Sequence, residues 1–249
     1  MMKTNKKEDE KKVQDYVAKD YEEKRYAKNY SLAYQDWWSK KMIDLVEPEG
    51  KILDNGCGTG YFADRFLREY DVMGIDVSEE MVRYAQKRMK KVIQGDAQNL
   101  PFEDNIFDVV IARSLLHHLA SPEQGVKEIK RVLKNGGRVI FVETISSFLS
   151  NLPRKILYKK SKHFSKEHKN FKEKELLRLI DSELKIKKKY YFGYLAYPLL
   201  GFSDILDLYK YIPFKFIFTP SLIKLDEVIA KIPLIKKQAW GIMILAEKR

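Results

Sequence analysis

The sequence predicts an α/β protein built on a doubly wound, mostly parallel β-sheet. Between residues 51 and 143, short apolar runs alternate with helix-like segments, a pattern typical of strands joined by helical crossovers. A glycine-rich turn follows the first apolar run, and sheets of this kind bind their ligands where the strands end. These two observations together indicate a ligand-binding α/β domain.

The expected elements of this core alternate along the chain. We expect strands at residues 51–54, 72–76, 92–95, 107–112 and 138–143, and helices at residues 61–69, 79–89 and 123–133. Ser121 and Pro122 precede the last helix, where a capping hydroxyl and a first-turn proline are favoured. We therefore assign residues 47–145 to the ligand-binding core.

Two segments precede this core. Residues 1–12 are mostly Lys, Glu and Asp, and we expect a segment of this composition to be a disordered tail. Residues 13–46 have a helical pattern in which Tyr and Trp recur. We expect them to form an N-terminal helical cap that packs on the core.

The chain changes character after the core. Residues 146–239 are rich in basic and aromatic side chains. We expect a sixth strand at residues 184–192, and we expect residues 240–249 to form a last, antiparallel strand at the edge of the sheet. The helical and aromatic insertion at residues 193–235 is where we expect substrate specificity, although extra core or a dimer face would explain the same composition.

Composition limits the classes of protein that fit. A chain of 249 residues suits one elaborated domain (1–249), and a single cysteine excludes an internal disulfide. No signal-peptide pattern and no uncharged run of the ~20 residues needed to span a membrane are present, so we expect a cytoplasmic protein, soluble or attached to a membrane surface. Residues 1–150 carry 25 basic and 25 acidic side chains, whereas residues 151–249 carry 22 and 10. The net charge of +12 therefore lies in the last part of the chain, which suits RNA, an anionic membrane or an acidic substrate.

The turn after the first strand carries the strongest functional signal. Gly56, Gly58 and Gly60 are spaced by two residues, and glycines at such a turn let the backbone approach a ligand closely. An ordinary strand-to-helix turn would also explain these glycines. However, Asp76 ends the second apolar run about 20 residues later, where an acid that binds ribose hydroxyls is expected.

Four sequence blocks resemble those of class I S-adenosylmethionine-dependent methyltransferases. They lie at residues 52–61, 74–81, 95–119 and 133–139, and the first reads Asp54-Asn55-Gly56-Cys57-Gly58-Thr59-Gly60. The blocks are most similar to those of the branch of ubiquinone/menaquinone-biosynthesis and small-molecule methyltransferases. They depart slightly at Asn55, where that branch often has a different residue. The resemblance implies a seven-stranded Rossmann-like sheet and S-adenosyl-L-methionine as the cofactor.

The resemblance also implies which residues hold this cofactor. Asp76 would accept both ribose hydroxyls, Asp54 would steady the turn and the methionine ammonium group, and Asp96 would contact the adenine. The whole expected set is Tyr21, Asp54, Gly56, Cys57, Gly58, Gly60, Asp76, Val77, Met81, Asp96, Ala97, Arg113, Ser114 and Leu115. We expect Cys57 to be a small packing residue rather than a nucleophile.

His117 and His118 follow the fourth strand and are the candidate catalytic residues. Imidazole titrates near neutrality, so either could be a general base for a phenol or enol acceptor. Alternatively, the pair begins the connecting helix and only packs or caps it. No grouping of His, Cys, Asp and Glu in the sequence has metal-ligand spacing, and we expect no metal site.

The resulting hypothesis is a methyltransferase that acts by direct displacement on carbon or oxygen of a small or lipid-like acceptor. The basic C-terminal part would allow peripheral contact with an anionic membrane. Two alternatives stay open: an RNA methyltransferase that uses the basic region, and a cofactor-binding regulatory protein without turnover.

Overall fold

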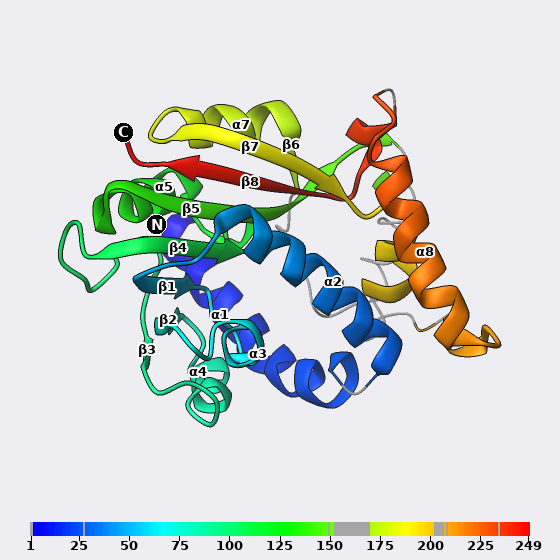
Figure 1. Cartoon of the computed structure of the whole chain (residues 1–249). Coiled ribbons are helices and arrows are strands. Elements are labelled where there is room, and N and C mark those ends of the chain that lie inside the picture. Colours follow the sequence, from blue (N-terminus) through cyan, green and yellow to red (C-terminus); the bar gives the residue numbers. More distant parts are fainter. Residues whose placement is uncertain are drawn as a thin grey trace.

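The computed structural model describes residues 2–26, 28–148, 150–151, 170–201, 207, 209–233 and 235–249. The densely basic part of the expected specificity region, residues 152–169, lies outside the described residues. The described parts form one central sheet with helices on both of its faces (Figure 1).

Eight strands form the sheet within the described residues. They are β1 (Lys51–Asn55), β2 (Asp71–Asp76), β3 (Val92–Gln94), β4 (Phe107–Arg113), β5 (Leu133–Ser146), β6 (Phe171–Lys172), β7 (Lys185–Phe192) and β8 (Gly241–Glu247). Seven follow the order β3-β2-β1-β4-β5-β8-β7, and the two-residue β6 pairs with β5 off this path. The first five strands are parallel, whereas β8 is antiparallel to both β5 and β7. The predicted doubly wound, mostly parallel sheet is confirmed.

Burial on both faces explains why the core strands are almost entirely apolar. In β1, Ile52 belongs to the hydrophobic cluster on one face and Leu53 to the cluster on the other. Val109 and Val110 of β4 divide between the two faces in the same way. A parallel sheet covered on both sides requires apolar residues at consecutive positions, so these strands form continuous runs rather than alternating ones.

The helices divide between the two faces of the sheet. α5 (Pro122–Val132) and α7 (Glu173–Asp181) cover one face, and α2 (Asn29–Val46), α3 (Tyr61–Phe66) and α4 (Glu79–Ala85) cover the other (Figure 1). The remaining helical segments are α1 (Met2–Asp20), η1 (Tyr21–Arg25), η2 (Leu116–His118), η3 (Tyr197–Gly201), η4 (Tyr209–Tyr211), α8 (Lys215–Ile229) and η5 (Lys236–Gln238). No helix in the described part of the chain combines the length and apolarity needed to cross a membrane.

The last strand is not at the edge of the sheet, so that prediction is wrong. β8 lies between β5 and β7, and its first six residues are buried. The edge strand is β7, whose Lys185, Lys187, Lys188 and Lys189 are exposed. The physical reason is charge: an uncharged strand suits the interior of the sheet, whereas lysines are favoured on an exposed edge because they discourage pairing with another chain.

The predicted disordered tail at residues 1–12 is also wrong, because these residues belong to α1 from Met2 onward. The helix is tied to the core at two points that composition alone does not reveal. Glu10 is buried and pairs with His118, and Lys7 forms an ion pair with Asp96. Further along α1, Val17 and Ala18 pack against Met81 of α4. The charged start of the chain is ordered because its charges have partners on the core.

The predicted insertion before the last strand packs with the N-terminal cap in one small apolar cluster. Leu200 of η3, Tyr209 of η4 and Ile223 of α8 pack around Tyr34 of α2. The N-terminal cap and the insertion therefore share one apolar cluster beside the carboxyl ends of the strands.

Candidate active site

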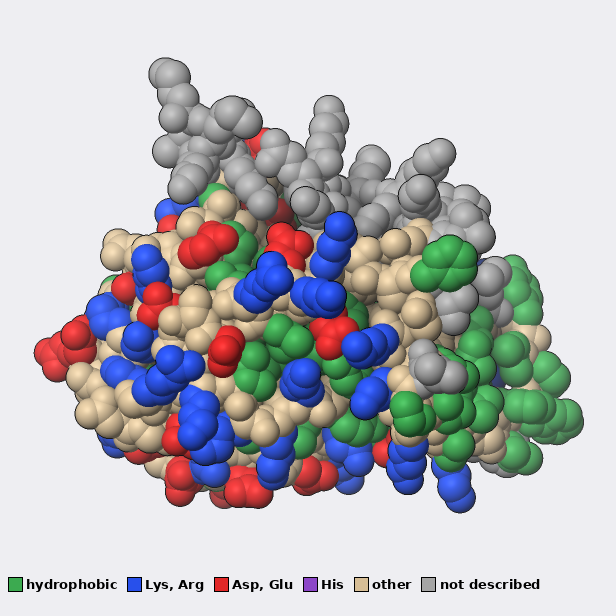
Figure 2. All heavy atoms as spheres, turned by 90° about the horizontal axis from the view of Figure 1, so that it is seen from above, with side chains coloured by type: hydrophobic (Ala, Val, Ile, Leu, Met, Phe, Trp, Pro, Cys, Tyr) green, Lys and Arg blue, Asp and Glu red, His purple; other side chains and the backbone are tan. Residues whose placement is uncertain are grey.

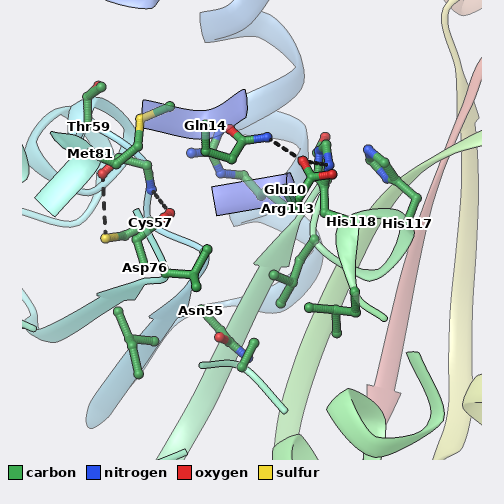
Figure 3. A pocket seen from close by; sticks show the side chains of 18 of the residues that line it. Glu10, Gln14, Asn55, Cys57, Thr59, Asp76, Met81, Arg113, His117 and His118 are labelled. Atoms are coloured by element: carbon green, nitrogen blue, oxygen red, sulfur yellow. Dashed lines mark hydrogen bonds and ion pairs between the residues drawn. The ribbon is translucent and has the colours of Figure 1, made fainter. Parts of the chain in front are cut away.

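A cavity lies at the carboxyl ends of β1, β2 and β4, beneath α1 (Figure 3). The turn residues Cys57 and Thr59 lie on one side of it, and His117 and His118 lie on the other. Of the expected cofactor residues, the cavity is lined by Tyr21, Gly56, Cys57, Gly58, Asp76, Val77, Met81, Asp96, Ala97, Arg113, Ser114 and Leu115. The sequence pattern thus brings together residues from six separate segments of the chain.

The turn between β1 and α3 depends on glycine at two cavity positions. Gly56 and Gly58 have φ angles of +79° and +55°, a region that other residues rarely adopt. A Cβ at Gly56 would come within 3.0 Å of Leu115 Cδ1. The N–H groups of Gly56 and Cys57 both donate to the carbonyl of Ile75, which fixes the turn against the end of β2.

Asp76 is held in place by two backbone donors. The N–H of Gly58 donates to Asp76 Oδ2 at 2.9 Å, and that of Ser78 donates to Oδ1 at 3.0 Å. The pKa of Asp76 is raised overall, because the effect of burial outweighs that of these two N–H groups, which lower the pKa. A carboxylate has about four acceptor positions, so both oxygens can accept further hydrogen bonds from a ligand in the cavity.

A group of buried polar atoms beside the turn has no partner among the described residues. It comprises both carboxylate oxygens of Asp54, the side-chain amide of Asn55, Thr59 Oγ1 and Arg113 Nε. Burial raises the pKa of Asp54 to about 6, and the positive charge of Arg113 acts against that rise. Buried polar groups are normally hydrogen-bonded, so this group indicates a polar, charged ligand rather than an empty core.

Arg113 is placed by aromatic rings rather than by carboxylates. Its guanidinium lies 4.3 Å from the ring centroid of Phe62 and 5.6 Å from that of Trp38. Cation–π contacts of this kind hold a charged side chain while leaving its donors available. The end of β4 therefore presents a cation to the same region in which Asp54 presents an acid.

The opposite part of the cavity is closed by α1. Lys7 Nζ lies 2.7 Å from Asp96 Oδ2, and Asp96 also accepts from the N–H of Gln98. Met81 is 1% exposed at the floor, where Tyr21 packs in the same apolar cluster. This part combines one carboxylate with apolar surfaces, an environment that suits a flat heterocycle.

Glu10 connects α1 to the histidine pair. Its Oε1 lies 2.7 Å from His118 Nδ1 and accepts from Gln14 Nε2 at 2.8 Å (Figure 3). Burial raises the pKa of Glu10, but the hydrogen bond and charge of His118 outweigh this effect and lower the pKa to about 2. Glu10 is therefore ionised at neutral pH and fastens α1 over the cavity.

His117 is held by a carboxylate in the interior. Its Nδ1 lies 2.5 Å from Glu143 Oε2, and Glu143 Oε1 accepts from the N–H groups of Leu115 and Leu116. Burial raises the pKa of Glu143 to about 7, because its effect outweighs that of these backbone donors, which lower the pKa. The Nδ1 atom of His117 is therefore committed to Glu143, and Nε2 is the ring nitrogen that Glu143 does not contact.

Asp54 and Gly60, both expected in the cofactor set, do not line the cavity. Asp54 is fully buried beneath the turn. Gly60 has a φ of +74°, and a Cβ there would come within 3.1 Å of Ala85 Cα, so this glycine allows the turn to pack on α4. Cys57 is buried, and burial raises the pKa of its thiol well above the usual value, which agrees with a packing role.

Sequence reasoning missed several residues that line or support the cavity. Lys7, Glu10 and Gln14 lie in the segment expected to be a tail or a packing helix. Glu143 was expected only as the last residue of a strand. A single acid within the apolar run Val139-Ile140-Phe141-Val142-Glu143 was the available signal, because a lone buried charge requires a partner. Among the described residues, no group of three or more His, Cys, Asp or Glu could hold a metal ion.

Comparisons with known proteins agree with this geometry. Residues 53–141 match the family model described as a methyltransferase domain. An uncharacterized protein of Methanocaldococcus jannaschii is 34% identical over 151 residues, which cover 57% of this chain and 70% of that protein. A demethylmenaquinone methyltransferase of Thermotoga maritima is 35% identical over 116 residues, 43% of this chain, and the match spans only half of that enzyme's length.

One solved structure extends the similarity over nearly the whole fold. It is an S-adenosylmethionine-dependent methyltransferase of Thermotoga maritima, described as a possible histamine N-methyltransferase. The TM-score is 0.65 at 23% identity, over 96% of this chain and all of that one. The chain belongs to the class I S-adenosylmethionine-dependent methyltransferases.

Proposed function

We propose that this enzyme transfers a methyl group from S-adenosylmethionine to carbon or oxygen of a small or lipid-like acceptor by direct displacement. The observation that carries the proposal is the buried pair of His117 and Glu143, which presents one imidazole to an aromatic-lined part of the cavity. A base held in this way suits an acceptor that must lose a proton when it is methylated.

The cofactor fits the polar groups that surround the turn. Asp76 would accept the ribose hydroxyls, Asp96 and Met81 would border the adenine, and Asp54 would offset the ammonium charge. The support for this assignment is the set of buried polar atoms at Asp54, Asn55 and Thr59 that have no partner in the described part of the chain. When bound, the cofactor supplies a methyl group on a positively charged sulfur, which leaves as a neutral thioether.

The acceptor would occupy the part of the cavity lined by Tyr34, Trp38, Thr144 and Tyr197. Rings from α2 and η3 meet there, because the N-terminal cap and the insertion pack on each other. Such a chamber favours an apolar body over a polar chain. The two hydroxyl groups of Tyr34 and Thr144 would orient a small polar head at its inner end.

The chain's own contribution to the reaction is alignment and proton removal. As the acceptor forms its bond to the methyl carbon, His117 Nε2 takes the acceptor's proton, and the Glu143 carboxylate stabilises the resulting imidazolium. Positioning supplies much of the acceleration in a displacement of this kind. A covalent relay is disfavoured, because burial keeps the thiol of Cys57 protonated.

The test is a panel of acceptors assayed with His117→Asn, His118→Asn and Glu143→Gln. The names of the relatives suggest demethylmenaquinone and histamine as the first compounds to try. We expect His117→Asn to lower kcat by about 10²- to 10⁴-fold, and His118→Asn to have a much smaller effect. Equal losses in both variants would contradict the role of His117.

The pH dependence of kcat/KM separates the two possible roles of the His117–Glu143 pair. If Glu143 positions and stabilises a basic His117, Glu143→Gln shifts the acidic limb of the profile to lower pH. If the pair only packs the start of η2, the same variant lowers the rate or the stability without moving that limb. Inversion of configuration at a chirally labelled methyl group would support direct displacement, and retention would contradict it.

An RNA substrate is the alternative that the basic C-terminal part suggests. The described lysines of β7 lie at the sheet end remote from the cavity, because β7 is parallel to β5 and its final residue, Phe192, lies at the cavity end. This placement favours a small acceptor. A regulatory protein without turnover is the remaining alternative, and methylation of any compound in the panel would exclude it.

A further inference from the structure

The outer face of α8 carries an apolar stripe exposed to solvent. The members of the stripe within the helix recur at intervals of one, three or seven residues, which places them on one face, and one further member flanks each end of the helix. The outer stripe consists of Phe214 (66% exposed), Ile217 (54%), Phe218 (49%), Leu225 (46%), Val228 (51%) and Ile232 (40%). Figure 2 shows hydrophobic side chains gathered at the right of the molecule, the side on which α8 lies in Figure 1.

The opposite face of α8 already serves the fold. Thr219, Ile223 and Asp226 are buried there, and Ile223 packs in the cluster around Tyr34. Asp226 accepts hydrogen bonds from the N–H groups of Tyr194, Leu195 and Ala196. The outer stripe is therefore additional to the core, and the helix has a buried face and a separate, exposed apolar face.

The positive side chains of α8 and its C-terminal end lie beside the stripe, whereas the negative side chains of the helix have partners in the protein. Lys224 is exposed beside the stripe, and Lys231 is exposed just beyond the end of the helix. Lys215 lies on the other flank, where its Nζ donates to the carbonyl of Lys210. The two acids of the helix are used inward: Asp226 is buried, and Glu227 accepts from Trp37 Nε1. The surface that surrounds the outer stripe is therefore positive.

We propose that the outer stripe of α8 docks the enzyme onto an anionic lipid surface. An apolar face flanked by lysines is the pattern of a helix that lies in the membrane interface, where the apolar side chains enter the acyl boundary and the ammonium groups reach the lipid head groups. A second copy of the chain fits less well, because joining two stripes would bring lysines against lysines.

Docking through α8 would bring the acceptor chamber close to the lipid. The inner face of the helix packs in the cluster that contains Tyr34, and Tyr34 lines the cavity. Helix α8 itself and the side chains of this cluster thus lie between the proposed membrane surface and the chamber. Lipid binding is measured without cofactor or acceptor, so this inference succeeds or fails independently of the proposed reaction.

The experiment is co-sedimentation of the full chain with vesicles of phosphatidylcholine and of an equimolar mixture of phosphatidylcholine and phosphatidylglycerol. We expect binding to the anionic vesicles, weakened by salt. Phe218→Ser/Leu225→Ser should reduce the partition coefficient at least about tenfold. Lys224→Gln/Lys231→Gln should reduce it about 25-fold, because each lysine near an anionic surface contributes about fivefold.

Two matched controls keep the test falsifiable. Tyr70→Ser removes a partly exposed aromatic ring elsewhere, and Lys185→Gln/Lys189→Gln removes two charges from β7; both should bind like the wild type. Near-ultraviolet circular dichroism establishes that every variant is folded. Failure of the wild type to bind anionic vesicles, or equal binding by the stripe variant, would overturn the proposal.

The other occupants of this surface give different results in the same set of proteins. Dimerisation that depends on concentration and is lost in Phe218→Ser/Leu225→Ser would assign the stripe to a second copy and overturn the lipid proposal. Binding to a homopolymeric RNA that is lost with the lysines and unaffected by the stripe variant, without vesicle binding, would also overturn it.

Discussion

Replacing Asp54 by Asn tests whether the buried carboxylate under the turn is kept for a ligand. Burial raises the pKa of Asp54 from 3.8 to about 6, and both of its oxygens are without partners in the described structure. A raised pKa means that the folded state binds the proton of Asp54 more tightly than the unfolded state does. The associated stability is fully present below pH 3.8 and is lost as the pH rises through 6.

The magnitude follows from the size of this shift. A difference of about two pKa units corresponds to about 3 kcal/mol of unfolding free energy lost at pH 8, and about half of that is already lost at pH 5. Asp54→Asn carries no charge and escapes this loss. Between pH 5 and pH 8, the variant should therefore gain about 1.4 kcal/mol on the wild type.

Urea denaturation of the cofactor-free protein at the two pH values measures this gain. Comparing two pH values cancels any fixed effect of the amide itself. The exposed Asp71, which pairs with Lys91 at the surface, provides the control Asp71→Asn, for which we expect no gain. The same Asp54 variant should bind S-adenosylmethionine at least about tenfold more weakly, because the negative charge proposed to offset the ammonium group is lost. A variant that is no more stable at pH 8 than at pH 5, relative to wild type, and binds the cofactor normally would refute the reasoning.

Three further changes test other parts of the site. Asp76→Ala removes the proposed acceptor for the ribose hydroxyls and should raise the Kd for S-adenosylmethionine at least about tenfold by calorimetry; an unchanged Kd would show that the ribose binds elsewhere. Gly60→Ala should lower the unfolding free energy by about 2–3 kcal/mol, and Gly136→Ala by only about 1–2 kcal/mol. Both glycines have positive φ angles, but only a Cβ at Gly60 would contact Ala85. Equal losses in the two variants would contradict the packing argument. Glu10→Gln should speed tryptic cleavage in α1 at neutral pH. Its difference in stability from the wild type should vanish as the pH falls from 4.5 toward 2, since the pKa of Glu10 is lowered to about 2. Equal cleavage rates would indicate that α1 is not fastened by Glu10.

Local patterns in the sequence were sufficient for the core of the fold. The apolar runs around Ile52 and Val109 are buried on both faces of the sheet, and the glycine turn lies where the first strand ends. Asp76 was predictable because its distance from the turn is a property of neighbouring strands in one sheet. These features depend on residues that are close in sequence or joined by one crossover.

Features that depend on distant partners could not be predicted in this way. Glu10 and Lys7 appear as solvated charges until His118 and Asp96 are placed beside them. The lysines of β7 and the apolar run of β8 were the local signal for which strand lies at the edge, but the pairing of β8 with β5 depends on residues that are far apart in the sequence. The role of Glu143 depends on His117, which follows a different strand, β4, and contacts Glu143 only in the folded chain.

The most direct test of the whole account is methyl transfer into a fractionated extract of the host cell. The purified chain is incubated with S-adenosylmethionine labelled at the methyl group, and the lipid, small-molecule, RNA and protein fractions are then separated and counted. The account predicts label in the lipid or small-molecule fraction, lost with Asp76→Ala and strongly reduced with His117→Asn. Label in the RNA fraction, or label in no fraction despite tight cofactor binding, would contradict it.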